Sequence, residues 1–323
     1  MPMLPHTRPA ALLILCALIL ITAVQLRAQI ITGELRQWHR ITLSFEGPDA
    51  SETGDTNPFA DYRLEVTLSH AEDTVVVPGY FAADGHAAET GASGGNMWRA
   101  HFAPHLAGAW NYSVICVAGE DVAISGAAGE PVAPHGISGA FEVGTSDKLP
   151  PDNRARGRLQ YVHQRYLRFA GTGDYFLKIG ADAPETFLAY TGFDSTTMQD
   201  GGSPLKDWSP HVADWKPGDP VWRDDRGKGI IGAINYLASE GQNAISFLTM
   251  NIDGDGRNVW PYLDPATRDR FDCSKLDQWE IVFDHADRNG MYLHFKTQET
   301  ENDQLLDGGA LGRERKLYYR EMI

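Results

Sequence analysis

Hydrophobic and polar residues alternate along the first half of the chain, in short segments separated by turn residues. Ile41–Phe45, Tyr62–Leu68 and Trp98–Phe102 each follow this period-two pattern, and no helical periodicity interrupts the series between residues 30 and 143. Alternation of this kind is typical of strands that bury one face, and the Gly-Pro, Asn-Pro and Pro-Gly pairs between the segments mark turns. The pattern predicts an all-β, immunoglobulin-like sandwich of about seven antiparallel strands over residues 29–146.

The pattern changes after residues 147–158, a polar linker that contains two consecutive prolines. Beyond it, short apolar segments such as Ala244–Met250 alternate with stretches of helical periodicity such as Ile230–Ala238. A further helix is predicted after Ser274, which forms a capping box with Asp277. Alternating strands and amphipathic helices favour βαβ units and a parallel sheet.

Residues 159–323 are predicted to form about three strand–helix units of a (β/α)8 TIM barrel, with Tyr175–Ile179 as its first strand. A whole barrel takes about 250 residues, whereas 165 follow Arg158. The last helical segment, from Arg313, ends without a capping residue. We therefore expect the chain to break off inside the barrel, and a small complete α/β domain is the alternative.

An almost unbroken apolar run occupies residues 10–24. It is shorter than the about 20 residues that span a membrane and has the length of a signal-peptide core. We expect residues 1–28 to be a signal peptide, cleaved after Ala28, with an uncleaved anchor as the alternative. The mature protein would then be secreted or periplasmic and not associated with a membrane.

Charge and motifs exclude several classes of protein. The chain has 28 Lys and Arg against 43 Asp and Glu, a formal charge of −15, so it lacks the basic footprint of a nucleic-acid binder. It contains no P-loop, dinucleotide fingerprint, G-x-S-x-G elbow or paired-histidine metal motif. We predict no cofactor and no metal, we do not favour a disulfide between Cys116 and Cys273, and the oligomeric state is open.

Two parts of the chain resemble a known family. Asn57-Pro58-Phe59, Val77–Phe81 and Phe102–Tyr112 resemble the N-terminal β-sandwich domain of unknown function of secreted bacterial glycoside hydrolases, a likeness that runs from about residue 38 to 143. Tyr175–Gly180 through Leu188–Tyr190 resembles the first strand and loop of the TIM-barrel domain of those enzymes, and Phe295–Asp303 resembles the end of its third strand.

The resemblance implies a parent protein that hydrolyses a plant, algal or bacterial polysaccharide with two carboxylates and no cofactor. In such barrels the acid/base residue follows the fourth strand and the nucleophile follows the seventh, and neither strand is expected in this chain. We therefore assign no catalytic residue and expect the chain as given to be inactive.

Side chains that follow the expected strands are candidates for contacting a carbohydrate, because barrel active sites lie at the carboxyl ends of the strands. The candidates are Asp182, Glu185, Tyr190, Trp208, Trp215, Trp222, Asp253, Trp260, Lys296, Gln298 and Glu299. Indole rings pack well on sugar rings, but the three tryptophans of the long loop could equally pin that loop to the fold. Glu299 could instead form a structural ion pair, and Asp253 with Asp255 favours a tight polar turn over a calcium site.

A second function is a non-catalytic carbohydrate-binding or cell-surface adhesion protein. In that case the predicted sandwich would be the functional module, with Tyr80, Phe81 or Trp98 as an exposed aromatic platform. The alternative is that the sandwich packs on the barrel and buries these aromatic side chains in its core.

Overall fold

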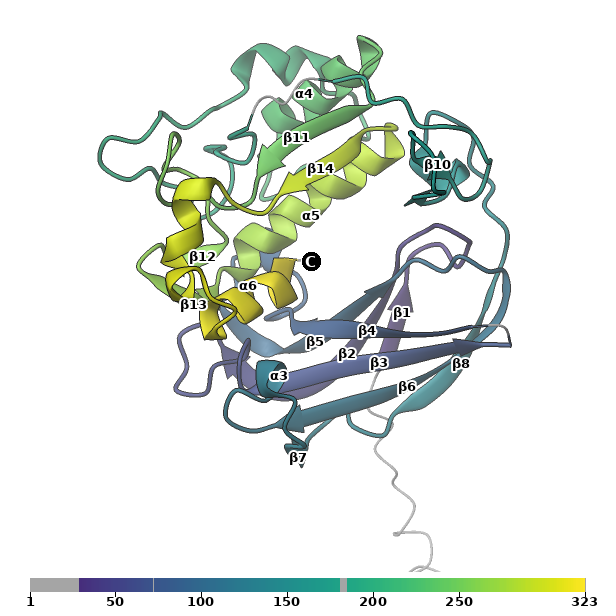
Figure 1. The fold of residues 1–323 in the computed structure, drawn as a ribbon, viewed down its shortest axis with the longest axis vertical. Coiled ribbons are helices and arrows are strands. Elements are labelled where there is room, and N and C mark those ends of the chain that lie inside the picture. Colours follow the sequence, from purple (N-terminus) through teal and green to yellow (C-terminus); the bar gives the residue numbers. More distant parts are fainter. Residues whose placement is uncertain (1–28, 72, 181–184, 323) are drawn as a thin grey trace, which may run out of the picture.

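The computed structural model describes residues 29–71, 73–180 and 185–322. The expected signal peptide, residues 1–28, and the candidate Asp182 lie outside these residues. A curled β-sheet forms one half of the described molecule, and a half that contains the longer helices sits over it (Figure 1). Among the described helices, none is long and apolar enough to cross a bilayer.

Eight strands form one antiparallel sheet in the first half. Their order is β1-β2-β5-β4-β3-β6-β7, and β8 also pairs with β6. The strands are β1 (Gln29–Thr32), β2 (Ile41–Ser51), β3 (Tyr62–His70), β4 (Asp73–Phe81), β5 (Gly94–Phe102), β6 (Gly108–Ala118), β7 (Glu130–Pro131) and β8 (Ser138–Val143). The short helices α2 (Ala87–Thr90) and α3 (Val122–Ser125) lie between them in sequence.

Strand β4 joins the two arms of the curled sheet, which are β1-β2-β5 on one side and β3-β6 with β7 and β8 on the other. Its first part pairs with β3, and its last residues, Gly79 to Phe81, pair with β5. A side chain at Gly79 would collide with the Leu64 side chain and would lie 2.8 Å from the backbone oxygen of Arg99. The sheet can therefore bend closely at this position only because glycine occupies it.

The concave face of the sheet is the hydrophobic core of the first half. Leu64, Val66, Leu68 and Trp110 are fully buried, and the Trp98 side chain is only 1% exposed. The alternation predicted that this face of the strands would be buried, and the structure confirms it. The immunoglobulin-like sandwich is nevertheless wrong, because the strands form one continuous curled sheet instead of two stacked ones. Periodicity reports which face of a strand is buried, but it does not report which strands pair.

The second half consists of short elements around one pair of parallel strands. They are η1 (Asn153–Ala155), β9 (Leu159–Gln160), β10 (Arg168–Phe169), η2 (Ser209–Asp214), α4 (Lys228–Ser239), β11 (Ala244–Leu248), β12 (Tyr262–Asp264), β13 (Thr267–Phe271), α5 (Cys273–Arg288), β14 (Tyr292–Lys296), η3 (Thr300–Leu305), η4 (Asp307–Gly309) and α6 (Arg313–Met322). Strands β11 and β14 pair in parallel, and α5 is on the connection between them.

The predicted partial (β/α)8 barrel is wrong for the described residues. Their only parallel strands are β11 and β14, and the other small sheets, β9 with β10 and β12 with β13, are antiparallel hairpins. Tyr175–Ile179, the expected first strand, makes a single bridge from Tyr175 to Arg168 and leaves Leu177 and Ile179 exposed. Apolar runs and helical periodicity are local patterns, so they predict individual strands and helices. A barrel also requires pairing between strands far apart in the sequence, which a local pattern does not encode.

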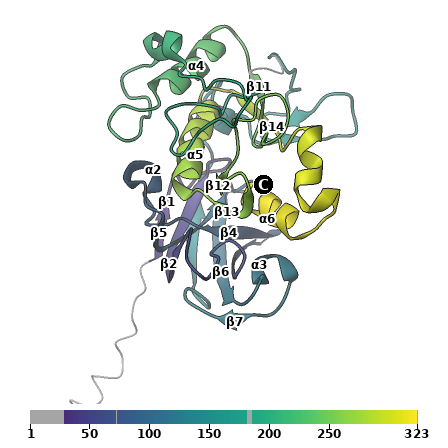
Figure 2. The ribbon, with the colours of Figure 1, turned by 90° about the vertical axis from the view of Figure 1, so that its left-hand side faces the viewer.

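The two halves share buried surface. One hydrophobic cluster contains Leu64 and Trp98 of the sheet together with Tyr262, Phe271 and Tyr318 of the second half. Helix α2 packs against α5 (Figure 2). The division at residues 147–158 thus remains a prediction based on sequence, because the core itself is continuous across it.

Candidate functional site

A polar cluster lies where the parallel strands β11 and β14 end. Lys296 is the last residue of β14, and its Nζ donates to Oε1 of Glu185 over 2.6 Å. The Glu185 carbonyl accepts a hydrogen bond from the backbone N–H of Leu248, the last residue of β11, over 2.8 Å. Both side chains of the ion pair are thereby fixed at the carboxyl ends of neighbouring strands, the position where open α/β sheets bind ligands.

Glu299 adds a second carboxylate to this cluster. Its Oε2 atom is buried and has no hydrogen-bond partner among the described residues. It packs so closely against Gly254 that a side chain there would overlap it. Burial raises the pKa of Glu299, the N–H of Asp255 opposes this, and the negative charge of Glu185 adds to the increase. Glu299 is therefore a carboxyl group with unused hydrogen-bonding capacity next to a fixed ion pair.

Asn302 connects the loop after β11 to the segment after β14. Its Oδ1 accepts a hydrogen bond from the N–H of Asp253 over 2.8 Å, and its Nδ2 donates to the Asp253 carbonyl. The side chain is fully buried. Sequence reasoning missed this residue, because an asparagine in a polar stretch carries no signal that it will be buried against a distant loop.

The loop that carries Asp253 is a tight polar turn. Oδ1 of Asn251 accepts from the backbone N–H of Asn258 over 3.0 Å and from that of Val259 over 2.7 Å. These two bonds close the loop on itself and leave Asp253 exposed at its tip. Gln298, on the other segment, donates to Oδ1 of Asp303 over 3.1 Å.

The aromatic candidates lie elsewhere and mostly inside the fold. Trp222 is fully buried and stacks on Phe193 with ring centroids 5.4 Å apart, and Tyr190 is buried against the same two rings. Trp260 is buried in the core that both halves share. These three side chains support the fold and are not available as a sugar platform.

Trp208 and Trp215 are half-buried on the long loop before α4. The Trp208 ring lies 5.8 Å from that of Phe187, and the Nζ of Lys228 at the start of α4 lies 4.8 Å from the Trp215 ring centroid. Both rings therefore hold the loop against the fold, which was the alternative considered for them. The structure thus brings Glu185, Lys296, Glu299 and the Asp253 loop together and places the aromatic candidates apart from them.

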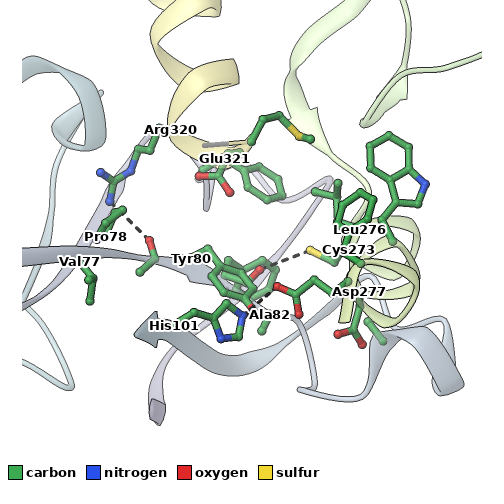
Figure 3. Close-up of a pocket in the computed structure, with 18 of the residues that line it drawn as sticks. Val77, Pro78, Tyr80, Ala82, His101, Cys273, Leu276, Asp277, Arg320 and Glu321 are labelled. Atoms are coloured by element: carbon green, nitrogen blue, oxygen red, sulfur yellow. Dashed lines mark hydrogen bonds and ion pairs between the residues drawn. The ribbon is translucent and has the colours of Figure 1, made fainter. Parts of the chain in front are cut away.

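A cavity of about 400 Å³ separates the sheet from α5 and α6 (Figure 3). Most of its wall is apolar. Nε2 of His101 in this wall lies 2.8 Å from both the Tyr80 hydroxyl and Oε1 of Glu280. Phe81 and Trp98 are buried. The aromatic platform considered for an adhesion protein is therefore part of the core and of this internal wall.

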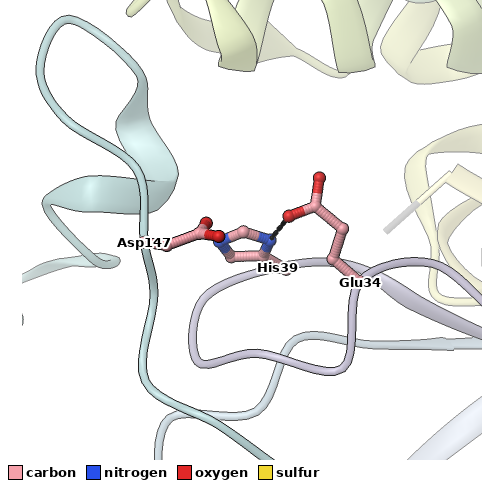
Figure 4. Close-up of side chains that lie close together, drawn as sticks. All are labelled: Glu34, His39 and Asp147. Carbon is pink, nitrogen blue, oxygen red and sulfur yellow. Dashed lines mark ion pairs between the residues drawn. The ribbon is translucent and has the colours of Figure 1, made fainter.

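Glu34 and Asp147 flank the buried His39 (Figure 4), and one atom from each of the three lies within 4.8 Å of the others. Such a set could ligate a metal ion, but cations already surround it. The Lys148 ammonium lies 2.7 Å from Glu34 and 3.3 Å from Asp147, and Arg154 lies 3.6 Å from Glu34. The cluster fastens the linker to the loop before β2 through ion pairs.

Comparison with known proteins identifies relatives of the fold. Residues 34–117, which include β2 to β5 and most of β6, match the family described as "Domain of unknown function (DUF5060)". A solved structure from Bacteroides vulgatus ATCC 8482, described as a "putative glycoside hydrolase", has a TM-score of 0.51 and 17% sequence identity to this chain. The likeness covers 84% of this chain and 42% of that one. No curated protein matches the chain.

These matches confirm the sequence resemblance in a coarse form. Part of the sheet matches a domain of unknown function, and the fold has a distant likeness to one protein described as a "putative glycoside hydrolase". At 17% identity the likeness concerns the fold alone. This chain spans less than half of the protein that it resembles, so that protein's activity enters below only as a proposal.

Proposed function

We propose that this chain is the glycan-binding part of an exported, glycosidase-related protein. The observation that carries the proposal is the polar cluster at the carboxyl ends of β11 and β14, where the Glu185–Lys296 ion pair lies near the unpartnered Oε2 of Glu299. The fold shared with the Bacteroides vulgatus protein supports the choice of a sugar as the ligand. The apolar run at residues 10–24 supports export to the periplasm or the exterior.

The chemistry of the cluster suits sugar hydroxyl groups. Each hydroxyl donates one hydrogen bond and accepts others. The half-buried Glu299 carboxyl group and the exposed Asp253 carboxylate supply acceptors, while the Lys296 ammonium supplies donors. Hydrogen bonds to charged groups are worth about 1.5–3 kcal/mol each, so two or three of them would give useful affinity for an oligosaccharide.

We expect binding without hydrolysis. Glycosidases need one carboxyl group as an acid and a second as nucleophile or base, roughly 5–9.5 Å apart across the bond that they cleave. Glu185 is held in an ion pair with Lys296, and one oxygen of Glu299 is packed against Gly254. Neither carboxylate is therefore free to approach a glycosidic bond.

Calorimetric titration of the purified chain with neutral plant and algal oligosaccharides tests this function. We expect binding by one of them, weakened about tenfold by Glu299→Gln, a loss of roughly 1.5 kcal/mol for one charged hydrogen bond. Glu142→Gln is the matched control, since Glu142 is exposed on β8. Equal affinity of the Glu299 variant, or no binding of any of the sugars, would refute the site, and released reducing ends would refute the non-hydrolytic role.

A further inference from the structure

The segment between residues 156 and 175 has a charge opposite to that of the rest of the chain. It contains Arg156, Arg158, Arg165 and Arg168 but a single acidic residue, Asp174, in a protein of net charge −15. Within the part of the chain that the structure describes, none of these four arginines forms an ion pair, whereas the preceding Arg154 binds Asp152. The segment therefore keeps a local positive charge that its surroundings do not neutralise.

An aromatic contact anchors this segment on the second half. Phe169 of β10 is buried, and its ring lies 5.8 Å from Phe176 and 5.7 Å from Tyr292 of β14. The Phe176 and Tyr292 rings are themselves 5.0 Å apart. These contacts hold one face of the β9–β10 hairpin against the fold, so its opposite face projects from it (Figure 1).

The opposite face presents arginine and tyrosine side chains to solvent. The antiparallel register places Gln160, Arg168 and Tyr175 opposite one another, hence on one face. The Arg168 guanidinium lies 5.8 Å from the Tyr175 ring centroid, and Arg165 lies 5.4 Å from that of Tyr166 in the adjoining loop. Tyr166 and Tyr175 are 43% and 48% exposed. We call the outward side chains Gln160, Arg165, Tyr166, Arg168 and Tyr175 the hairpin surface.

We propose that the hairpin surface binds an anionic polysaccharide, a polymer whose sugars carry carboxylate or sulfate groups. Planar guanidinium groups pair with such anions through two parallel hydrogen bonds. The faces of tyrosine rings pack against the C–H groups of a sugar ring. The inference rests on the proposed function for its choice of a sugar polymer. A nucleic acid is disfavoured because its dense phosphate charge would meet a predominantly acidic protein beyond this small basic surface.

Affinity electrophoresis and titration of the purified chain test this proposal, with polygalacturonate as the probe and a neutral β-glucan beside it. We expect binding to polygalacturonate that weakens between about 50 and 200 mM salt, and none to the glucan. The double variant Arg165→Gln/Arg168→Gln should bind about tenfold more weakly. Lys316→Gln removes one charge from the exposed face of α6 and should bind as the unaltered chain does.

Two variants of Tyr175 test the contribution of its aromatic ring separately from that of the arginine charges. Tyr175→Ala should weaken binding several-fold, while Tyr175→Phe keeps the ring and should retain most of the affinity. Circular dichroism of each variant shows that the fold is intact. Unchanged affinity in the double arginine variant would overturn the proposal, and so would equally tight binding of a single-stranded RNA oligomer, which would indicate a surface for nucleic acid.

The outcome is separable from that of the glycan site. Glu299→Gln should weaken the binding of a neutral oligosaccharide about tenfold and leave polygalacturonate binding unchanged. Binding of polygalacturonate by a chain that binds no neutral sugar would support the hairpin surface and refute the site at the strand ends. Binding of a neutral sugar without polygalacturonate would do the reverse.

Discussion

Glu52 is a carboxyl group buried at the junction of the two halves. It follows β2, is 4% exposed, and its Oε1 accepts a hydrogen bond from the backbone N–H of Cys273 over 2.6 Å at the start of α5. Burial raises the pKa of Glu52 to about 7, the Cys273 N–H opposes this, and the charge of Asp272 adds to the increase. A large share of this side chain is therefore protonated near neutral pH in the folded protein.

Glu52→Gln should remove a pH dependence of stability. The pKa of Glu52 is raised on folding, so the stability linked to it is complete below about pH 4.5 and is lost as the pH rises through about 7. Glutamine keeps the acceptor oxygen but does not ionise. We expect the variant to have a higher free energy of unfolding than the unaltered chain at pH 8, by about 1–3 kcal/mol, and no advantage at pH 4.5.

Urea unfolding of both proteins at the two pH values measures this difference. Glu46→Gln, an exposed position on the same strand β2, is the control and should leave the pH dependence unaltered. If Glu52→Gln were less stable than the unaltered chain at pH 8, the native state would depend on the ionised carboxylate and the prediction would be wrong.

Helix α5 shows how a sequence pattern can place an element correctly and its first residue incorrectly. The capping box at Ser274 predicts a helix here, and the structure has one, but its N-cap is Asp272, whose side chain accepts from the N–H of Lys275 over 2.9 Å. Asp277, expected to complete the box, instead accepts from the N–H of Ala88 in α2 over 2.7 Å. Asp277 is thus engaged in a tertiary contact with α2, although the local pattern assigned it to the N-terminus of its own helix.

Asp272→Ala should destabilise the protein more than Ser274→Ala. The first change removes the cap, worth about 1–2 kcal/mol. It also removes the carboxylate 3.9 Å from the buried Lys275 ammonium, which adds to the loss. The Ser274 hydroxyl only donates to Asp272 over 2.9 Å. Thermal unfolding of the two variants compares them, and a larger loss for Ser274→Ala would restore Ser274 as the cap.

The whole molecule is held together by charges as well as by its shared core. Arg40 of the sheet half lies 2.7 Å from Asp284 and 3.4 Å from Glu280 of α5, and His101 of β5 also contacts Glu280. Burial disfavours ionisation of Glu280, but the hydrogen bond from His101 and the positive charges of Arg40 and Arg99 outweigh it, so the pKa of Glu280 falls to about 2. The ionised carboxylate therefore ties α5 to the sheet.

Glu280→Gln should weaken this junction at neutral pH. A lowered pKa contributes stability above about pH 4.5 that is lost as the pH falls towards 2. At pH 7 we expect the free energy of unfolding to fall by about 1–3 kcal/mol, in one cooperative transition because the core is continuous. Asp225→Asn, whose side chain is 78% exposed and whose partner Lys228 is 2.8 Å away, should cost less than about 0.5 kcal/mol. A loss of the same size in both variants would contradict this role of Glu280.

At the scale of the site, the sequence indicated the ends of β11 and β14 but not which side chains meet there. Glu185 and Lys296 were both candidates, yet they are 111 positions apart and their 2.6 Å contact depends on the parallel pairing of two strands. Asn302 was not a candidate, although it fixes the Asp253 loop. Trp222 was a candidate because of its chemistry, and the fold uses its area to fill the core.

The sequence by itself determined which face of each sheet strand is buried and where helices α4 and α5 lie, because side-chain periodicity is a local property of the chain; the expected strand Tyr175–Ile179 did not form. Alternation at Leu64, Val66 and Leu68 marked a buried face without any knowledge of its partner strands. Only the tertiary structure decided that β4 joins two arms into one curled sheet, and that the second half holds a single parallel strand pair among its described residues. Strand pairing depends on free energies of contact between residues far apart in the chain, and those contacts exist only after the chain has folded.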